Sequence, residues 1–419
     1  MNALTRGIGM LELGGRTAAS FARIGLDAVE DGFGTALPRT AEALANPRTV
    51  STLLRDAAPW PAPDGEPATP LPEIADVRLP GVDFESSNCR NFLLEVEYAD
   101  SDAAKSAGAP KTLYAKMPCA DLATRAFANT LGFWPLEVTF CQRLAAHIPI
   151  RVPKVYAAAQ KGARFVLLME DLHASPGTRL FINRDMAAGT TPERAARILR
   201  GFAQMHAHFH GASDEERERL LPLRYNTYRA PRWRRVTRAL QGGSLEPARK
   251  VVPEYVTEGL IDTCRIALDR WDAVVDAWYD GPLTLCHGDS HLGNCFEYPG
   301  ERQGEVRVGM IDFQAVHWSK GIRDVQYFLI NSMEPDVLAE NEDALIRGYC
   351  EALGEDGVTL DFDTAKTQYR SFTYQTLMVS IVPLGLGSLT ERDETVLTIM
   401  RRSAAAFERL DFREWVEGL

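Results

Sequence analysis

The chain has 419 residues and a formal net charge of −11, from 46 Lys or Arg and 57 Asp or Glu side chains. A length of this order exceeds one ordinary hydrophobic core, so we expect two or three domains. The acidic balance disfavours nucleic acid and an anionic membrane surface as partners, because both attract a basic face.

The start of the chain shows neither a signal sequence nor a membrane anchor. Residues 1–8 contain no apolar core, and no run of about eighteen apolar residues occurs in the sequence. The seven cysteines are scattered without a Cys-x-x-Cys pair, which is typical of free thiols in a reducing compartment. We therefore expect a cytoplasmic protein without a membrane span.

Residues 1–80 are expected to form a helical N-terminal extension and a linker. Residues 1–58 carry helical patterns that glycines interrupt, and Ala41 to Leu54 has apolar residues at helical spacing. Residues 58–67 are rich in proline, which breaks helices and strands, so this segment is expected to be a loop.

Residues 81–170 are expected to form a small lobe of antiparallel strands with one helix. Phe92–Tyr98 and Thr112–Met117 have strand composition, and the polar segment between them favours a hairpin. Leu131–Ala146 has apolar residues at helical spacing, and Phe165–Met169 is another apolar run of strand length.

Residues 171–419 are expected to form a large, mainly helical lobe. Thr191 followed by Pro192 is typical of a helix start, and this helix should extend to about Gly211. A second long helix is expected over Ile261–Tyr279, and Val306–Phe313 should be a strand. The fold class is therefore α+β, with a small β lobe, a large helical lobe and an extra helical N-terminal segment.

The strongest functional pattern is HGDSHLGN at 287–294, followed by IDFQ at 311–314. Asp289, Asn294 five positions later, and Asp312 before a Phe follow the order of base, metal-holding Asn and metal-holding Asp in protein kinases. A carboxylate can accept the proton of an attacking hydroxyl, and carboxylate and amide oxygens suit Mg²⁺. The pattern predicts His287, Asp289 and Asn294 as catalytic residues, and Asn294 and Asp312 as Mg²⁺ ligands.

A metal-dependent hydrolase is an alternative interpretation of the same segment. His287, Asp289 and His291 are residue types that bind Zn²⁺ and similar ions. That interpretation leaves Asn294 and Asp312 without a role, so phosphoryl transfer is favoured.

Lys116 and Glu137 supply the upstream part of a phosphoryl-transfer site. Lys116 lies in a predicted strand, and Glu137 lies on the helix that follows, where a Lys–Glu ion pair would hold the lysine for the ATP phosphates. The alternative for Lys116 is a solvent-facing strand lysine, which is the common case.

Two further segments are candidates for contact with the nucleotide. Glu85–Asn91 precedes a strand and could cover phosphates with backbone N–H groups, with Ser87 and Asn88 as the candidate residues, or it could be an ordinary polar turn. The segment Leu167–Leu172, which contains Glu170, could hydrogen-bond adenine through its backbone as the connector between lobes.

Other polar residues near these motifs are interpreted as structural. His206 and His210 share a helix face, but no Glu between them gives the His-Glu-x-x-His metal motif, so support beneath the catalytic loop is favoured. Asp324 begins a helix, where it could cap that helix or brace the catalytic loop.

The pattern of residues 287–294, of Asp312-Phe313-Gln314 and of Gly321-x-x-Asp324 resembles the aminoglycoside phosphotransferase and choline-kinase-like superfamily, and most closely its ecdysteroid-kinase-like branch. The resemblance covers roughly residues 85–385. It implies a bilobal protein-kinase-like fold, with ATP held by Lys116, Mg²⁺ held by Asn294 and Asp312, and Asp289 as the base for transfer to a small-molecule hydroxyl.

The acceptor is the part of the function that the motifs leave open, because it is set by helices outside them. The candidate lining residues are aromatic, which favours a hydrophobic or aromatic-compatible alcohol over a polycationic aminoglycoside, while a quaternary amine such as choline could use an aromatic cage. These candidates are Trp318, Tyr327, Tyr369 and Tyr374, and each could instead belong to the core. A catalytically silent, nucleotide-binding pseudokinase is the alternative from a different class, and the oligomeric state stays open.

Overall fold

The computed structural model describes residues 3–31, 37–59, 71–84, 88–222, 228–386 and 394–419. The chain forms two compact units. The sheet unit comprises Gly14–Thr178, and the helical unit comprises Met1–Leu13 together with Arg179–Leu419. The long helix α1 (Ala3–Asp31) contains the first boundary, so its first part belongs to the helical unit and the rest to the sheet unit.

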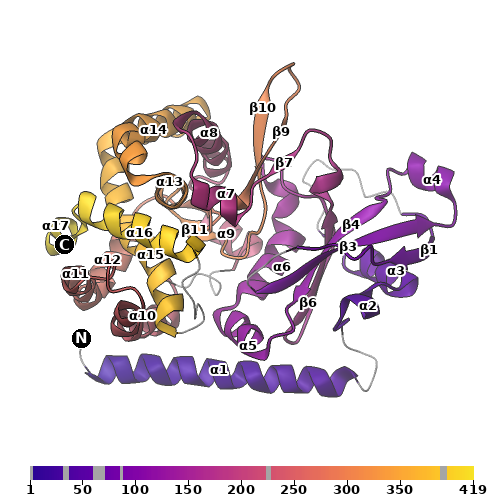
Figure 1. Ribbon diagram of the computed structural model, residues 1–419, viewed down its shortest axis with the longest axis horizontal. Helices are drawn as coiled ribbons and strands as arrows, with labels where there is room; N and C mark the ends of the chain where they lie inside the picture. The colour runs from indigo at the N-terminus through magenta and orange to yellow at the C-terminus, as the bar shows by residue number, and fades with distance from the viewer. Residues whose placement is uncertain (1–2, 32–36, 60–70, 85–87, 223–227, 387–393) are drawn as a thin grey trace. The chain divides into compact units, whose positions relative to one another are not determined.

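The sheet unit is built on one antiparallel sheet in the order β1-β3-β4-β6-β5, with β2 also paired to β3 (Figure 1). Its elements after α1 are α2 (Ala41–Leu44), α3 (Pro47–Asp56), β1 (Ile74–Arg78), β2 (Asp83–Phe84), β3 (Cys89–Tyr98), α4 (Ser101–Ser106), β4 (Thr112–Pro118), α5 (Leu122–Leu131), α6 (Phe133–Arg143), η1 (Ala145–His147), β5 (Val155–Lys161), β6 (Arg164–Glu170) and η2 (Leu172–Ala174).

The two faces of this sheet contact different helices, because successive strand side chains point to opposite sides. Leu113, Ala115 and Met117 of β4 belong to a hydrophobic core that also contains Leu44 and Leu53 of α2 and α3. On the other face α6 packs against β5 and β6, with the rings of Trp134 and Phe165 5.3 Å apart. Lys116 lies between Ala115 and Met117 on the strand, so its side chain points to the opposite face of the sheet, toward α6.

The expected separation of residues 1–80 differs from what the structure shows. The buried side chains of α2 and α3 complete the sheet core, and β1 pairs with β3, so residues 41–56 and 71–80 are part of the sheet unit. The unit also contains more than the single helix expected, since the segment between β3 and β4 holds α4, which Asp100 caps by accepting from two backbone N–H groups. Local polarity indicated a turn but did not distinguish it from a short capped helix.

In the helical unit the strands that the structure describes are short, and they border the loops (Figure 1). Helix α15 is central in this unit and packs against α10, α13 and α16, while α8 packs against α14. The elements are β7 (Arg179–Leu180), α7 (Asn183–Ala188), α8 (Pro192–His208), α9 (Asp214–Leu220), α10 (Pro231–Val251), α11 (Glu258–Asp269), α12 (Trp271–Tyr279), β8 (Thr284–Cys286), η4 (Leu292–Asn294), β9 (Cys295–Pro299), β10 (Val306–Met310), β11 (His317–Ser319), α13 (Ile322–Ser332), α14 (Pro335–Glu355), α15 (Phe362–Leu386), α16 (Glu394–Arg409) and α17 (Phe412–Glu417).

The single helix expected over residues 261–279 is two helices. The helix breaks at Arg270, and the adjacent Trp271 is buried and donates from its indole nitrogen to the carbonyl of Arg234 at 2.9 Å. This contact with α10 is tertiary, so the local pattern did not contain it. The α+β class, with a small antiparallel sheet unit and a mainly helical unit, is confirmed.

Two further expectations concern the chain as a whole. All seven cysteines are free thiols, as their scattered positions indicated. Among the residues that the structure describes, no helix is long and apolar enough to cross a membrane.

Candidate active site

The loop 287–294 begins where strand β8 ends. Strand β8 pairs with β11, and the partner of Cys286 is His317. The chain then turns at Gly288, which has φ +87°, and a Cβ at this position would lie 2.0 Å from the carbonyl oxygen of Ala315. Only glycine therefore fits here, which explains why His-Gly-Asp replaces the His-Arg-Asp of protein kinases.

His287 holds the loop against the segment that carries Asp312. Its Nε2 contacts the carbonyl of Ile311 at 2.8 Å, and its Nδ1 lies 3.2 Å from the backbone nitrogen of Asp289. A carbonyl can only accept and a backbone N–H can only donate, so the partners require the neutral tautomer with the proton on Nε2. Burial lowers the pKa of His287, which favours the same neutral form. Both ring nitrogens are engaged, so His287 positions the loop and offers no free nitrogen to a metal.

Asp289 is a half-buried carboxylate, 23% exposed, that is held from two sides. The hydroxyl of Tyr327 donates to Oδ1 at 2.8 Å, and Nδ2 of Asn294 donates to Oδ2 at 3.2 Å. Burial alone would raise the pKa of Asp289, but His291, His287 and the Tyr327 hydroxyl together lower it below its usual value. The carboxylate is thus ionised near neutral pH, as a base must be.

A β-ladder brings the surroundings of Asn294 and Asp312 together. Strands β9 and β10 pair antiparallel, with Cys295 opposite Met310 at the end nearest the loop. One step further, the N–H of Ile311 donates to the carbonyl of Asn294 at 3.0 Å. The two predicted metal ligands therefore lie at the same end of one hairpin.

Asn294 and Asp312 each show a feature suited to a ligand-binding position. The described hydrogen bonds of the Asn294 side chain all use Nδ2, including one to the carbonyl of Asp289 at 2.8 Å, which leaves Oδ1 for a cation. Asp312 has φ +63°, a left-handed conformation that strains a residue with a Cβ and is common at functional sites. Phe313 beside it is buried, with its ring 4.4 Å from that of His287.

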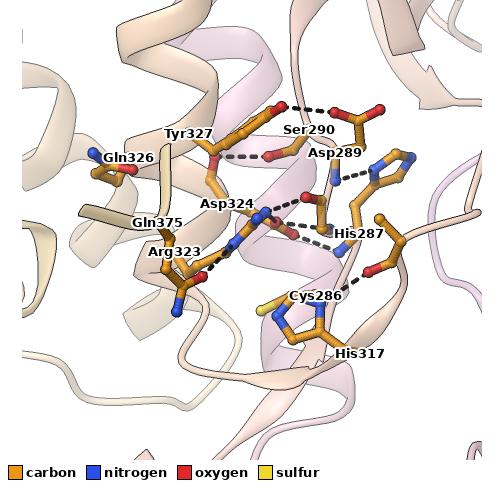
Figure 2. A network of polar contacts seen from close by, with 12 residues as sticks. Cys286, His287, Asp289, Ser290, His317, Arg323, Asp324, Gln326, Tyr327 and Gln375 are labelled. Carbon is orange, nitrogen blue, oxygen red and sulfur yellow. Dashed lines mark hydrogen bonds and ion pairs between the residues drawn. The ribbon is translucent and has the colours of Figure 1, made fainter. Parts of the chain in front are cut away.

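Asp324 braces the loop from helix α13. Its carboxylate accepts the N–H of His287 at 2.6 Å and that of Gly288 at 3.0 Å, while its backbone carbonyl accepts the hydroxyl of Ser290 at 2.9 Å (Figure 2). His206 supports Asp324 from below at 3.3 Å and contacts the hydroxyl of Tyr349 at 2.8 Å. The structural roles expected for Asp324 and His206 are confirmed.

The same region contains a group of possible metal ligands. His206, Cys286 and Asp324 are buried, and their ligand atoms lie within 4.8 Å of one another. Burial raises the pKa of the Cys286 thiol well above its ordinary value, so it is not a thiolate. Both oxygens of Asp324 already accept backbone N–H groups, so this group serves as a brace.

Arg323 is the residue of this network that the sequence interpretation missed. Its guanidinium is buried, donates to the carbonyl of Gly288, and lies 4.8 Å from the ring centre of Tyr327 (Figure 2). The sequence did not indicate that Arg323 is buried, because a charged residue at the start of a helix is usually exposed.

In the sheet unit, Lys116 and Glu137 form the expected ion pair. Nζ of Lys116 lies 2.7 Å from Oε1 of Glu137, and each residue is only 3% exposed. A solvent-facing lysine is therefore ruled out. Such a pair is expensive to desolvate, so its presence points to a role beyond stability.

The surroundings of the other nucleotide-contact candidates differ, and their contact with a nucleotide stays a prediction. Ser87 lies outside the described residues, and Asn88 accepts a hydrogen bond from the Cys89 thiol at 3.1 Å. The carboxylate of Glu170 binds Arg151 at 2.6 Å and Ser175 at 3.0 Å, so this side chain is engaged within its own unit.

Three of the four aromatic candidates for acceptor binding are core residues. Tyr369 and Tyr374 are fully buried, and Trp318 is 2% exposed with its indole donating to the carbonyl of Leu221 at 3.1 Å. Tyr374 packs among Trp271, Trp278 and Phe412. The expectation that these three line an acceptor site is therefore corrected, because the sequence pattern of a helix or strand cannot distinguish a core face from a pocket wall. Tyr327 contacts Asp289.

Comparison with known proteins gives the class and the family. The model of the ecdysteroid kinase-like family matches residues 96–361, which is more than half of the chain and includes Lys116, Glu137, Asp289, Asn294 and Asp312. Together with the fold, this match makes the protein a small-molecule kinase. The chain belongs to the ecdysteroid kinase-like family.

More distant similarities occur among solved structures. A protein from Ralstonia eutropha, provisionally named an aminoglycoside phosphotransferase, is 14% identical with a TM-score of 0.48, over 88% of this chain and 98% of that one. An ethanolamine kinase from Plasmodium vivax is 14% identical with a TM-score of 0.45 (80% and 83% covered), and a choline kinase from Streptococcus pneumoniae is 10% identical with a TM-score of 0.41 (80% and 94% covered). No curated protein sequence matched the chain. The family assignment depends on the family match alone.

Proposed function

We propose that this kinase transfers the γ-phosphate of ATP, with Mg²⁺, to a hydroxyl group of a small molecule, and that Asp289 is the base. The observation that carries the proposal is the environment of Asp289. Tyr327 holds one carboxylate oxygen, Asn294 contacts the other, and Asp324 fixes the loop that carries Asp289. Preorganised positioning is what phosphoryl transfer requires of the protein.

In the proposed reaction the acceptor O–H bond breaks and its proton passes to the Asp289 carboxylate. The acceptor oxygen forms a bond to the γ-phosphorus, and the bond from this phosphorus to the bridging oxygen breaks. The electron pair of that bond leaves with ADP. The imidazole of His287 is neutral and both of its nitrogens are engaged, so His287 is a positioning residue for this step. Asp289 is the proton acceptor.

The residues at the end of the β9–β10 hairpin fit a hard divalent cation. Oδ1 of Asn294 and the carboxylate of Asp312 are the oxygen ligands that Mg²⁺ prefers, and they would hold it. Mg²⁺ would supply charge neutralisation for the phosphates. Lys116, fixed by Glu137, is proposed to bind the ATP phosphates.

The acceptor is proposed as a small-molecule hydroxyl without a narrower class. The burial of Trp318, Tyr369 and Tyr374 removes the support for an aromatic-lined site. Lys116, Asp289, Asn294 and Asp312 are all retained, which speaks against a catalytically silent pseudokinase.

The test is turnover with Mg²⁺-ATP and a panel of alcohols, amines and sugars, followed by ADP release and by mass spectrometry of the acceptor. We expect acceptor-stimulated ADP release that Asp289→Asn abolishes while ATP binding persists, and that Asp312→Asn weakens Mg²⁺-ATP binding itself. The exposed Asp356→Asn is the matched control and should behave as wild type. ATP binding without turnover for any acceptor would favour a pseudokinase instead.

A further inference from the structure

Helix α13 contacts four consecutive residues of the catalytic loop. Asp324 binds the backbone of His287 and Gly288 and the side chain of Ser290. The remaining residue, Asp289, is reached by the hydroxyl of Tyr327, one helical turn beyond Arg323 (Figure 2). The helix therefore fixes both the path of the loop and the carboxylate that the loop presents.

The two oxygens of Asp289 are not equivalent. Oδ1 accepts a hydrogen bond of 2.8 Å from a hydroxyl that is part of a rigid helix. Oδ2 has the longer contact of 3.2 Å with Nδ2 of Asn294, and the same nitrogen also donates to the Asp289 carbonyl at 2.8 Å. The contact to Oδ2 is the longer of the two, 3.2 Å against 2.8 Å, so the hold on Oδ2 is the weaker.

Tyr327 is itself firmly placed. It is 3% exposed, and the Arg323 guanidinium lies 4.8 Å from its ring centre while also donating to the Gly288 carbonyl. A cation over a phenol ring holds the ring in place and makes its hydroxyl a better donor. Burial, and then the Asp289 charge, raise the pKa of Tyr327 well above its ordinary value, so the hydroxyl keeps its proton and acts as a donor.

We infer that Tyr327 is a positioning residue for the base: its hydroxyl occupies Oδ1 of Asp289, fixes the carboxylate rotamer, and leaves Oδ2 as the atom that receives the acceptor proton. This inference rests on the proposed function, since it assigns a role to the neighbour of the proposed base.

Tyr327→Phe is the test, because it removes one oxygen and keeps the ring. The probe is Mg²⁺-ATP with the acceptor identified by the panel and, in parallel, with water as acceptor. We expect kcat to fall by about 10- to 100-fold, the value of one hydrogen bond to a charged group, while the dissociation constant of Mg²⁺-ATP stays near wild type. A crystal structure of the variant should show Asp289 in a second rotamer.

The matched control is Tyr374→Phe, which removes another buried hydroxyl of the same unit, one that contacts Gln241 at 3.3 Å. It should keep wild-type kcat.

The outcomes separate this inference from the proposed function. An inactive Asp289→Asn together with a fully active Tyr327→Phe would overturn the positioning role and leave the function in place. Full turnover by Asp289→Asn would overturn the base assignment and the inference with it. A stability loss in Tyr327→Phe without a change in kcat would make the contact merely structural.

Discussion

Nε2 of His287 donates to the carbonyl of Ile311 at 2.8 Å, which joins the two functional motifs across 24 residues of sequence. Ile311 immediately precedes Asp312, and its own N–H donates to the carbonyl of Asn294. One imidazole therefore ties the loop of the proposed base to the segment of the proposed metal ligands.

His287→Ala should weaken both the fold and turnover. The Ile311 carbonyl and the Asp289 N–H each lose a buried partner, and an unsatisfied buried group costs about 1–3 kcal/mol. Urea unfolding should report this loss, and the rate of ADP release should fall in parallel. His210→Ala removes an exposed imidazole and should change neither. Wild-type turnover by His287→Ala would contradict the positioning role.

Gly288→Ala should be far more harmful than Gly281→Ala. Both glycines have positive φ, +87° and +81°, which costs about 1–2 kcal/mol for a residue with a Cβ. At Gly281 a Cβ meets nothing within 4 Å, whereas at Gly288 it would lie 2.0 Å from the Ala315 carbonyl oxygen. We expect both variants to lose stability and Gly288→Ala alone to lose turnover. Equal behaviour of the two variants would show that the close approach to Ala315 is unimportant.

Lys116→Met should destabilise the sheet unit by leaving the Glu137 charge buried without its cation. Breaking a buried pair on one side costs about 3–5 kcal/mol, while replacing both partners by apolar side chains is often neutral. Lys116→Met with Glu137→Met should therefore recover most of the free energy of unfolding but none of the ATP affinity. Lys161→Met is the control, because its side chain is 45% exposed and forms an ion pair with the partly exposed Glu30. Recovered ATP binding in the double variant would contradict the phosphate-binding role of Lys116.

Glu342 should make stability depend on acidic pH. It is 2% exposed and bound by Arg409 at 2.7 and 2.9 Å and by Lys366 at 3.1 Å. Burial alone would raise the pKa of Glu342, but the hydrogen bonds from Arg409 and the charges of Arg409 and Lys366 lower it below the ordinary 4.5. A carboxyl group whose pKa is lower in the folded than in the unfolded state stabilises the folded protein at any pH above its unfolded-state pKa. This contribution disappears as the pH falls through the folded-state pKa.

Glu342→Gln should therefore lower the free energy of unfolding at neutral pH by about 1–3 kcal/mol and make its decline below about pH 5 shallower. Glu414→Gln is the control, since that side chain is 73% exposed, and it should leave the free energy of unfolding near the wild-type value. Urea unfolding over a pH series measures both variants. If the free energy of unfolding of Glu342→Gln declined with falling pH as steeply as that of the wild type, Glu342 would not be the group that links stability to acidic pH.

The features that the sequence predicted correctly depend on local spacing. The order of Asp289, Asn294 and Asp312 is a property of one loop and one hairpin, and the facing of Lys116 toward α6 follows from strand alternation. The features that it did not predict depend on contacts between distant segments. Arg323 and Tyr327 acquire their roles only when α13 packs beneath the loop, and the aromatic residues of α15 are core because α10 and α12 cover them.

The β9–β10 ladder sets the separation of Asn294 and Asp312 by strand register. The far end of that hairpin lies around residues 300–305. Adding or removing residues there would change the number of residues between the two motifs but not the distance between Asn294 and Asp312. Homologues can therefore differ widely in this number of residues and still place both ligands alike. The hairpin tip is also the natural place to insert a tag or a fluorescent reporter, since an insertion there lengthens the ladder away from the Asn294 and Asp312 end.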